Sequence, residues 1–288
     1  ESWQTFFSDL ISGSDGQPTE SVPKPQAETR AVASVSSKPE TPNRPEATPP
    51  TDVPTKPITG PAKKIVENME LSLTVPTATS VRSMPVKVLE ENRRIINEHL
   101  QATGLGKASF THLIAWAIVK AIKDYPRMNH GFGEVNGAPS RIENQHTNLG
   151  IAIDIEKKDG SRNLLVPNIK NCEGMNFAEF FAAYNEQVKK AREGKLEIPD
   201  FQGTTVSLTN PGTLGTVASN PRLMAGQSAI IATGAIEYPA EYQAMTPAAL
   251  SQLGISKVIT LTSTYDHRVI QGAESGLFLG KMQEFLVA

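Results

Sequence analysis

Cysteine is almost absent from this chain of 288 residues, and neither sign of charge is in excess. The single cysteine, Cys172, excludes an internal disulfide and a cysteine-rich metal site. The 28 basic and 30 acidic side chains give a formal net charge of -2, so the basic face that nucleic-acid binding requires is not expected. Four histidines are scattered without metal-ligand spacing: His99, His112, His130 and His146. We therefore expect no metal site and no nucleic-acid partner.

Long apolar runs are also missing. The longest, residues 113–122, is interrupted by Lys120 and is far shorter than a membrane span. The N-terminus lacks the basic region followed by an apolar region that marks a signal peptide. We therefore expect no membrane association and a cytoplasmic protein. Because the chain begins at Glu1 rather than at methionine, we also expect it to be a piece of a longer chain.

Proline is concentrated in one stretch. Residues 12–62 contain 11 of the 21 prolines and no aromatic residue, so they cannot bury enough apolar area to offset the entropy of ordering. This composition predicts a disordered linker. Residues 1–11 instead place apolar side chains at helical spacing, namely Trp3, Phe6, Phe7 and Leu10. They are either a short amphipathic segment or the end of a truncated domain.

Residues 63–288 have the patterns of a folded domain. Helices and strands mix without strict alternation, which predicts an α+β fold, a two-layer α/β sandwich with a mixed central sheet. Expected strands are 70–75, 148–154, 163–169, 204–212, 227–236 and 257–262. Expected helices are 85–100, 110–124, 177–192 and 273–286. Ser109 is the expected N-cap of the second helix, and Pro126 ends it.

The stretch 264–272, with the sequence TYDHRVIQG, joins a predicted strand to a predicted helix. A histidine at such a boundary, His267, can be held rigidly and presented to a substrate as a base. The alternative is a structural histidine fixed by its charged neighbours, Asp266 and Arg268. The motif by itself leaves both interpretations open.

Four segments resemble one family, and they occur in the family's order. Residues 148–154 (NLGIAID) are similar to its NLGIAVD-like strand, 200–210 to DFxGGTFTISN, 227–236 to QSAILxxGAI and 266–272 to DHRxxDG. The domain thus resembles the catalytic domain of the dihydrolipoamide acyltransferases, the cores of the 2-oxo acid dehydrogenase complexes. The resemblance implies the fold that these enzymes share with chloramphenicol acetyltransferase.

A closer resemblance is to the actinobacterial fused 2-oxoglutarate dehydrogenases. Residues 75–82, 207–213 and 265–276 carry it. In these proteins a succinyltransferase domain precedes a decarboxylase on the same chain. The resemblance implies transfer of a succinyl group from dihydrolipoamide to coenzyme A in the tricarboxylic acid cycle.

The same resemblance implies a set of partners. A fused decarboxylase that uses thiamine diphosphate and magnesium is expected after residue 288. No lipoyl domain precedes residue 63, so the lipoyl group is expected from a separate lipoyl-bearing acyltransferase subunit. Dihydrolipoamide dehydrogenase is expected to complete the complex.

The resemblance also assigns roles to residues. Histidine is a suitable base for a thiol, and the family places that base at His267. The attacked thioester develops an oxyanion, for which the family supplies a hydroxyl donor at the position of Thr209. Without the family, Thr209 reads as an ordinary strand threonine. Asn210 is expected to orient the Thr209 strand, and Asp266 and Arg268 to fix the histidine loop.

One position departs from the family. Gln271 replaces an aspartate that most members have four residues after the histidine, and an amide can hydrogen-bond but carries no charge. Either Gln271 substitutes for an architectural aspartate, or the site is weakened. Arg82 is expected to contact coenzyme A because of its place in the matched segment 75–82.

Family members are trimers in which one chain supplies the histidine and its neighbour the hydroxyl. A homotrimer is therefore expected, and His267 and Thr209 need not be close in one subunit. Two alternatives compete with the succinyltransferase. One is an acyltransferase of the same fold acting on another acceptor, such as an antibiotic. The other is a non-catalytic trimerisation domain that docks the decarboxylase and the lipoyl carrier.

Overall fold

The structure is a computed structural model that describes residues 53–156 and 160–287. The expected amphipathic segment 1–11 and most of the expected linker, residues 12–52, lie outside the described residues. A compact unit begins at Pro57 and contains every helix and strand among the described residues. Within the described residues, no helix is both long enough and apolar enough to cross a membrane.

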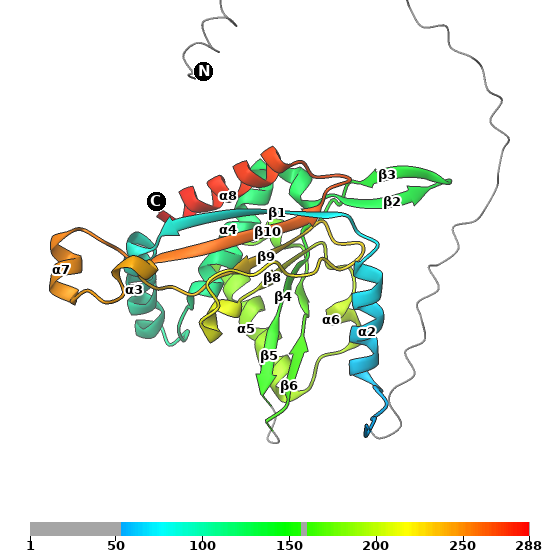
Figure 1. Cartoon of the computed structure of the whole chain (residues 1–288), viewed down its shortest axis with the longest axis horizontal. Helices are drawn as coiled ribbons and strands as arrows, with labels where there is room; N and C mark the ends of the chain where they lie inside the picture. The colour runs from blue at the N-terminus through cyan, green and yellow to red at the C-terminus, as the bar shows by residue number, and fades with distance from the viewer. Residues whose placement is uncertain (1–52, 157–159, 288) are drawn as a thin grey trace, which may run out of the picture. The chain divides into compact units, whose positions relative to one another are not determined.

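A six-stranded sheet forms the centre of the unit (Figure 1). Its strands lie in the order β1 (Thr77–Pro85), β10 (Val258–Asp266), β9 (Ala229–Thr233), β8 (Val206–Thr209), β4 (Leu149–Ile151) and β7 (Asn168–Ile169). The strand β8 pairs in parallel with β9 and β4, and the other three pairings are antiparallel. The predicted mixed central sheet is confirmed.

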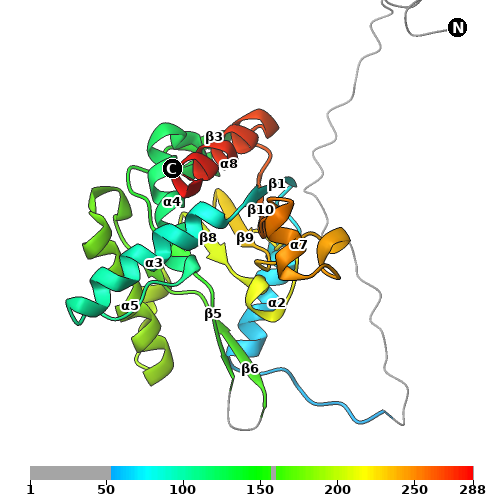
Figure 2. The ribbon, with the colours of Figure 1, turned by 90° about the vertical axis from the view of Figure 1, so that its left-hand side faces the viewer.

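Helices cover one face of the sheet. They are α3 (Lys87–Ala102), α4 (Phe110–Asp124), α5 (Phe177–Glu193) and α8 (Gly272–Val287), which gather on one side in Figure 2. On β10, Ile259 and Leu261 join the same apolar core as α4 and α8, and Ser275 of α8 donates a hydrogen bond to Ser263 at 3.0 Å. Thr260, Thr262 and Thr264 alternate with these residues, so the strand presents mainly apolar side chains to the helices and hydroxyls to the other face.

Several elements lie outside the central sheet. They are α2 (Pro61–Ser72), β2 (Gly131–Val135), β3 (Ala138–Ile142), β5 (Ile153–Glu156), β6 (Arg162–Leu165), α6 (Ile198–Phe201), α7 (Pro247–Gln252) and the 3₁₀ turns η1 (Pro126–Asn129), η2 (Cys172–Gly174), η3 (Pro211–Leu214) and η4 (Ala240–Tyr242). The strands β5 and β6 pair with each other, as do β2 and β3.

The helix predictions are confirmed. The helix α4 begins after Ser109, whose hydroxyl accepts from the backbone N–H of His112, while the His112 ring accepts from the Ser109 N–H. This reciprocal arrangement is a capping box. The helix α5 begins with a second one, between Asn176 and Glu179.

The predicted strand at residues 70–75 is wrong. Residues 70–72 are the last turn of α2, and β1 begins only at Thr77. The alternation of Leu71, Leu73 and Val75 suggested a half-buried strand, but only Val75 is buried, and Leu71 and Leu73 are 53% and 67% exposed, so the three do not share a buried face. Pro61 at the first turn of α2 suits a helix start.

Two other predicted strands are each divided. Residues 148–154 form β4 and β5, which separate at Ala152, and residues 163–169 contribute to β6 and β7, which separate around Pro167. The chain thus leaves the central sheet after β4, forms the hairpin of β5 and β6, and returns to the sheet at β7. The hairpin of β2 and β3 was not predicted, although its turn, Asn136–Gly137, has the positive φ values (53° and 75°) that this dipeptide favours.

Candidate functional site

His267 follows the last residue of β10. Its backbone N–H donates to the Pro76 carbonyl at 2.9 Å, and its side chain is exposed. The ring Nδ1 lies 3.0 Å from the Ile270 carbonyl oxygen. Because a carbonyl only accepts, Nδ1 must carry the proton, and the neutral ring keeps an unprotonated Nε2. An imidazole held in this way can accept a proton at Nε2.

The residues on either side of His267 form an ion pair. Asp266 is 2% exposed, and Arg268 donates to its two carboxylate oxygens at 2.9 and 2.7 Å. These hydrogen bonds raise the pKa of Arg268 and keep it charged. The guanidinium also lies 3.7 Å from the ring centroid of Phe132 in β2, a cation–π contact. These contacts agree with a loop-fixing role for both residues.

Gln271 is exposed, and its backbone N–H donates to Glu274 at 3.0 Å. The other carboxylate oxygen of Glu274 accepts from Arg127 at 2.9 Å. The Glu274 carboxylate therefore anchors the turn after His267 through the backbone of residue 271. The side chain of residue 271, which is aspartate in most of the family, is not the anchor. Sequence reasoning assigned no role to Glu274, although it lies in the matched segment 265–276, and missed Phe132, which lies outside every matched segment.

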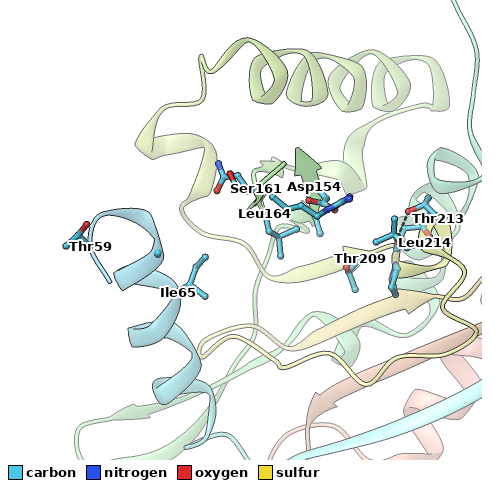
Figure 3. Close-up of a pocket in the computed structure, with 14 residues that line it drawn as sticks. Thr59, Ile65, Asp154, Ser161, Leu164, Thr209, Thr213 and Leu214 are labelled. Atoms are coloured by element: carbon cyan, nitrogen blue, oxygen red, sulfur yellow. Dashed lines mark hydrogen bonds and ion pairs between the residues drawn. The ribbon is translucent and has the colours of Figure 1, made fainter. Parts of the chain in front are cut away.

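Thr209 is the last residue of β8 and lines a cavity of about 670 Å³. Figure 3 shows Asp154, Thr213 and Leu214 around Thr209, with Ile65 of α2 on another wall. Asn210 donates from its amide to the Thr111 hydroxyl at 2.7 Å, which ties the residue after Thr209 to the first turn of α4. This contact agrees with the orienting role expected for Asn210.

Two glycines permit the turn after Thr209. A Cβ on Gly212 would lie 2.2 Å from the Gly234 carbonyl oxygen, and one on Gly234 would lie 1.8 Å from the Val217 oxygen. Real Cβ atoms do not approach backbone this closely, so three backbone segments meet here because two of them lack side chains.

His267 and Thr209 lie far apart in one chain. Thr209 pairs with Ala232 in β9, and Ala232 pairs with Thr262 in β10. His267 therefore lies two strands away from Thr209 across the sheet and about five residues further along β10 than the Thr209 partner row. Strand spacing and rise per residue make this separation roughly 20 Å. A single subunit presents the imidazole and the hydroxyl at separate places.

Arg82 lies on a different part of the surface. It pairs with Leu261 in the β1–β10 register, and its Nε donates to Gln283 of α8 at 2.6 Å. Its expected contact with coenzyme A stays a prediction.

Cys172 and His146 lie in surroundings that suit a structural role. Burial raises the pKa of the Cys172 thiol to about 12, which suits a packing residue. His146 pairs with Glu173 at 2.7 Å on the surface. Among the described residues, no group of three or more His, Cys, Asp or Glu side chains is placed to hold a metal ion.

A family model described as 2-oxoacid dehydrogenases acyltransferase (catalytic domain) matches residues 50–288. The chain belongs to this family. The acyltransferase domain is 55% identical over 233 residues to a protein of Mycolicibacterium vanbaalenii called a multifunctional 2-oxoglutarate metabolism enzyme. That match covers 81% of this chain but only 19% of the relative, so the chain spans about a fifth of the relative's length.

Solved structures share the fold of this acyltransferase domain. A probable dihydrolipoamide acetyltransferase from Listeria monocytogenes has a TM-score of 0.69 at 24% identity, covering 82% of this chain and 94% of that one. The cubic core of a pyruvate dehydrogenase multienzyme complex also has a TM-score of 0.69, at 25% identity, covering 83% and 96%. The predicted acyltransferase fold is confirmed.

Proposed function

We propose that this domain transfers a succinyl group from dihydrolipoamide to coenzyme A within a 2-oxoglutarate dehydrogenase complex. Membership of the acyltransferase family supports the reaction class, and the name of the Mycolicibacterium relative supports the 2-oxoglutarate pathway. One observation supports the proposal: the positions that the family motifs assign to the base and to the oxyanion donor carry an exposed imidazole with an available Nε2 and a hydroxyl on a cavity wall.

In the proposed mechanism, Nε2 of His267 removes the proton from the coenzyme A thiol. A free thiol has a pKa of about 8.5 and is mostly protonated at neutral pH, so it needs a base. The thiolate attacks the thioester carbonyl, and the Thr209 hydroxyl donates to the oxyanion that forms. Collapse of the intermediate breaks the bond to the dihydrolipoamide sulfur. That sulfur leaves as a thiolate and takes the proton back from His267.

The separation of roughly 20 Å means that one subunit cannot supply both groups to one carbonyl. We infer a homotrimer in which His267 of one subunit meets Thr209 of the next. Closed rings of three have this head-to-tail arrangement at every interface.

The remaining partners follow from the longer relatives. We propose a fused decarboxylase with thiamine diphosphate and magnesium, a lipoyl-bearing acyltransferase subunit, and dihydrolipoamide dehydrogenase, all in the cytoplasm. The relative's much greater length supports a further catalytic domain on its chain.

The test is coenzyme A-dependent transfer from succinyl-dihydrolipoamide by the wild type and by His267→Ala. General-base catalysis is worth about 10²–10⁴ in rate, so the variant should lose that much. His146→Ala removes another exposed histidine, paired with Glu173, and should retain activity. If the folded wild-type oligomer transfers no acyl group, the proposal fails and the assembly-domain alternative takes its place.

A further inference from the structure

The cavity at Thr209 contains one cationic side chain among the described residues that line it. That side chain is Arg162 at the start of β6, and the one anionic lining residue is Asp154 of β5. Hydroxyl, amide and apolar groups make up the rest of the wall. A volume of about 670 Å³ is in the usual range for a small-molecule site.

Asp154 holds Arg162 through one carboxylate oxygen. Both Nε, at 2.8 Å, and Nη2 of the guanidinium donate to Asp154 Oδ2. The third nitrogen, Nη1, forms an ion pair with Glu156 at 3.7 Å, a distance too long for a hydrogen bond. Since arginine has five N–H donors, the Nη1 donors are left without a hydrogen bond to either carboxylate, while Asp154 fixes the orientation of the group.

A succinyl thioester carries a carboxylate two methylene groups from its reacting carbonyl. An acetyl thioester carries none. If the carbonyl lies at Thr209, the carboxylate extends into the same cavity, where Ala152, Leu164 and Leu214 supply apolar surface for the methylenes. Arginine binds carboxylates with directed hydrogen bonds, and such charged hydrogen bonds are stronger than neutral ones.

We propose that Arg162, oriented by Asp154, binds the free carboxylate of the acyl group and selects a dicarboxylic acyl thioester over acetyl. The inference rests on the proposed function, because it assumes that the carbonyl lies at Thr209. Sequence reasoning assigned no role to either residue: Asp154 is the last residue of the expected strand 148–154, and Arg162 comes just before the expected strand 163–169. The register of the β5–β6 hairpin pairs Arg162 with Glu156 and places Asp154 two residues away along β5, within reach of the guanidinium.

The experiment measures binding of succinyl-CoA and acetyl-CoA to the intact oligomer by titration calorimetry, without a dihydrolipoamide acceptor. The wild type should bind succinyl-CoA about tenfold or more tightly than acetyl-CoA, the range of one charged hydrogen bond. Arg162→Gln should remove most of this preference, and Arg162→Lys should keep part of it. Arg141→Gln is the matched control, since Arg141 forms a similar exposed pair with Glu143 outside the cavity, and it should keep the full preference.

An absence of preference in the wild type, or an equal loss for both ligands in Arg162→Gln, would overturn the inference. The equal loss would place coenzyme A itself, rather than the acyl carboxylate, against Arg162. This readout is independent of turnover. A wild type that transfers succinyl but binds both ligands equally defeats the inference alone, whereas selective binding without any transfer defeats the proposed function alone.

Discussion

Two histidines show how position decides the role of one residue type. His267 is exposed and keeps Nε2 available, because Nδ1–H donates to Ile270. His112 is 7% exposed and uses both ring nitrogens internally. Its Nδ1 accepts from the Ser109 N–H at 3.1 Å, and its Nε2–H donates to Asn185 at 3.2 Å. The first arrangement suits proton transfer, and the second stabilises the junction of α4 and α5.

The burial of His112 predicts a pH-dependent stability. Burial lowers the pKa of His112 below its ordinary value of 6.5, so the unfolded chain takes up a proton first as the pH falls. The stability that neutral His112 contributes is complete above about pH 6.5 and decreases below it. Protonation of Nδ1 would also remove the acceptor for the Ser109 N–H.

The variant that tests this is His112→Gln. Glutamine at the third helical position also completes a capping box but does not titrate. The free energy of unfolding in urea, measured from about pH 7.5 to about pH 5, should therefore fall less in the variant than in the wild type. This range brackets the ordinary histidine pKa. Equal pH slopes in the two proteins would show that His112 is not the titrating group.

At the scale of elements, the end of β8 depends on close backbone packing at Gly234. Gly234→Ala places a methyl group 1.8 Å from the Val217 oxygen, so the Gly234 backbone or the segment at Val217, which follows the turn after Thr209, must shift. Overpacking typically costs about 1–3 kcal/mol, and we expect a loss of at least this size in urea unfolding. Acyl transfer should fall as well, because Gly234 packs against Gly212 in the turn that follows Thr209.

The control for Gly234→Ala is Gly276→Ala. Gly276 lies within α8, and a Cβ there would meet nothing within 4 Å. Alanine is the better helix former by about 1 kcal/mol, so this variant should be neutral or slightly more stable. If Gly234→Ala is equally well tolerated, the close approach does not determine the position of the turn.

Helices were predictable from the sequence because their ends carry local signals. Ser109 identified the start of α4, and the apolar spacing gave its buried face. Strand limits were less accessible, since the departure of the chain at Ala152 depends on how β5 pairs with β6. The family resemblance located His267 and Thr209. The cavity partners Asp154 and Arg162 required cross-strand register, which no local pattern contains.

At the scale of the molecule, the separation of His267 from Thr209 follows from sheet order alone. Two intervening steps, from β8 to β9 and from β9 to β10, are fixed by the pairings of Ala232. The sequence could not show this distance, because strand order is a long-range property. It makes oligomerisation a requirement of the proposed chemistry rather than an accessory to it.

Subunit complementation tests this central claim most directly. His267→Ala and Thr209→Ala chains carrying different tags are co-expressed, and oligomers with both tags are isolated. In a closed ring of three with mixed composition, one of the three interfaces joins an intact His267 to an intact Thr209, so about a third of wild-type activity should return. Each variant alone should stay inactive. Doubly tagged trimers that form but show no activity beyond that of the single variants would contradict a site shared between subunits.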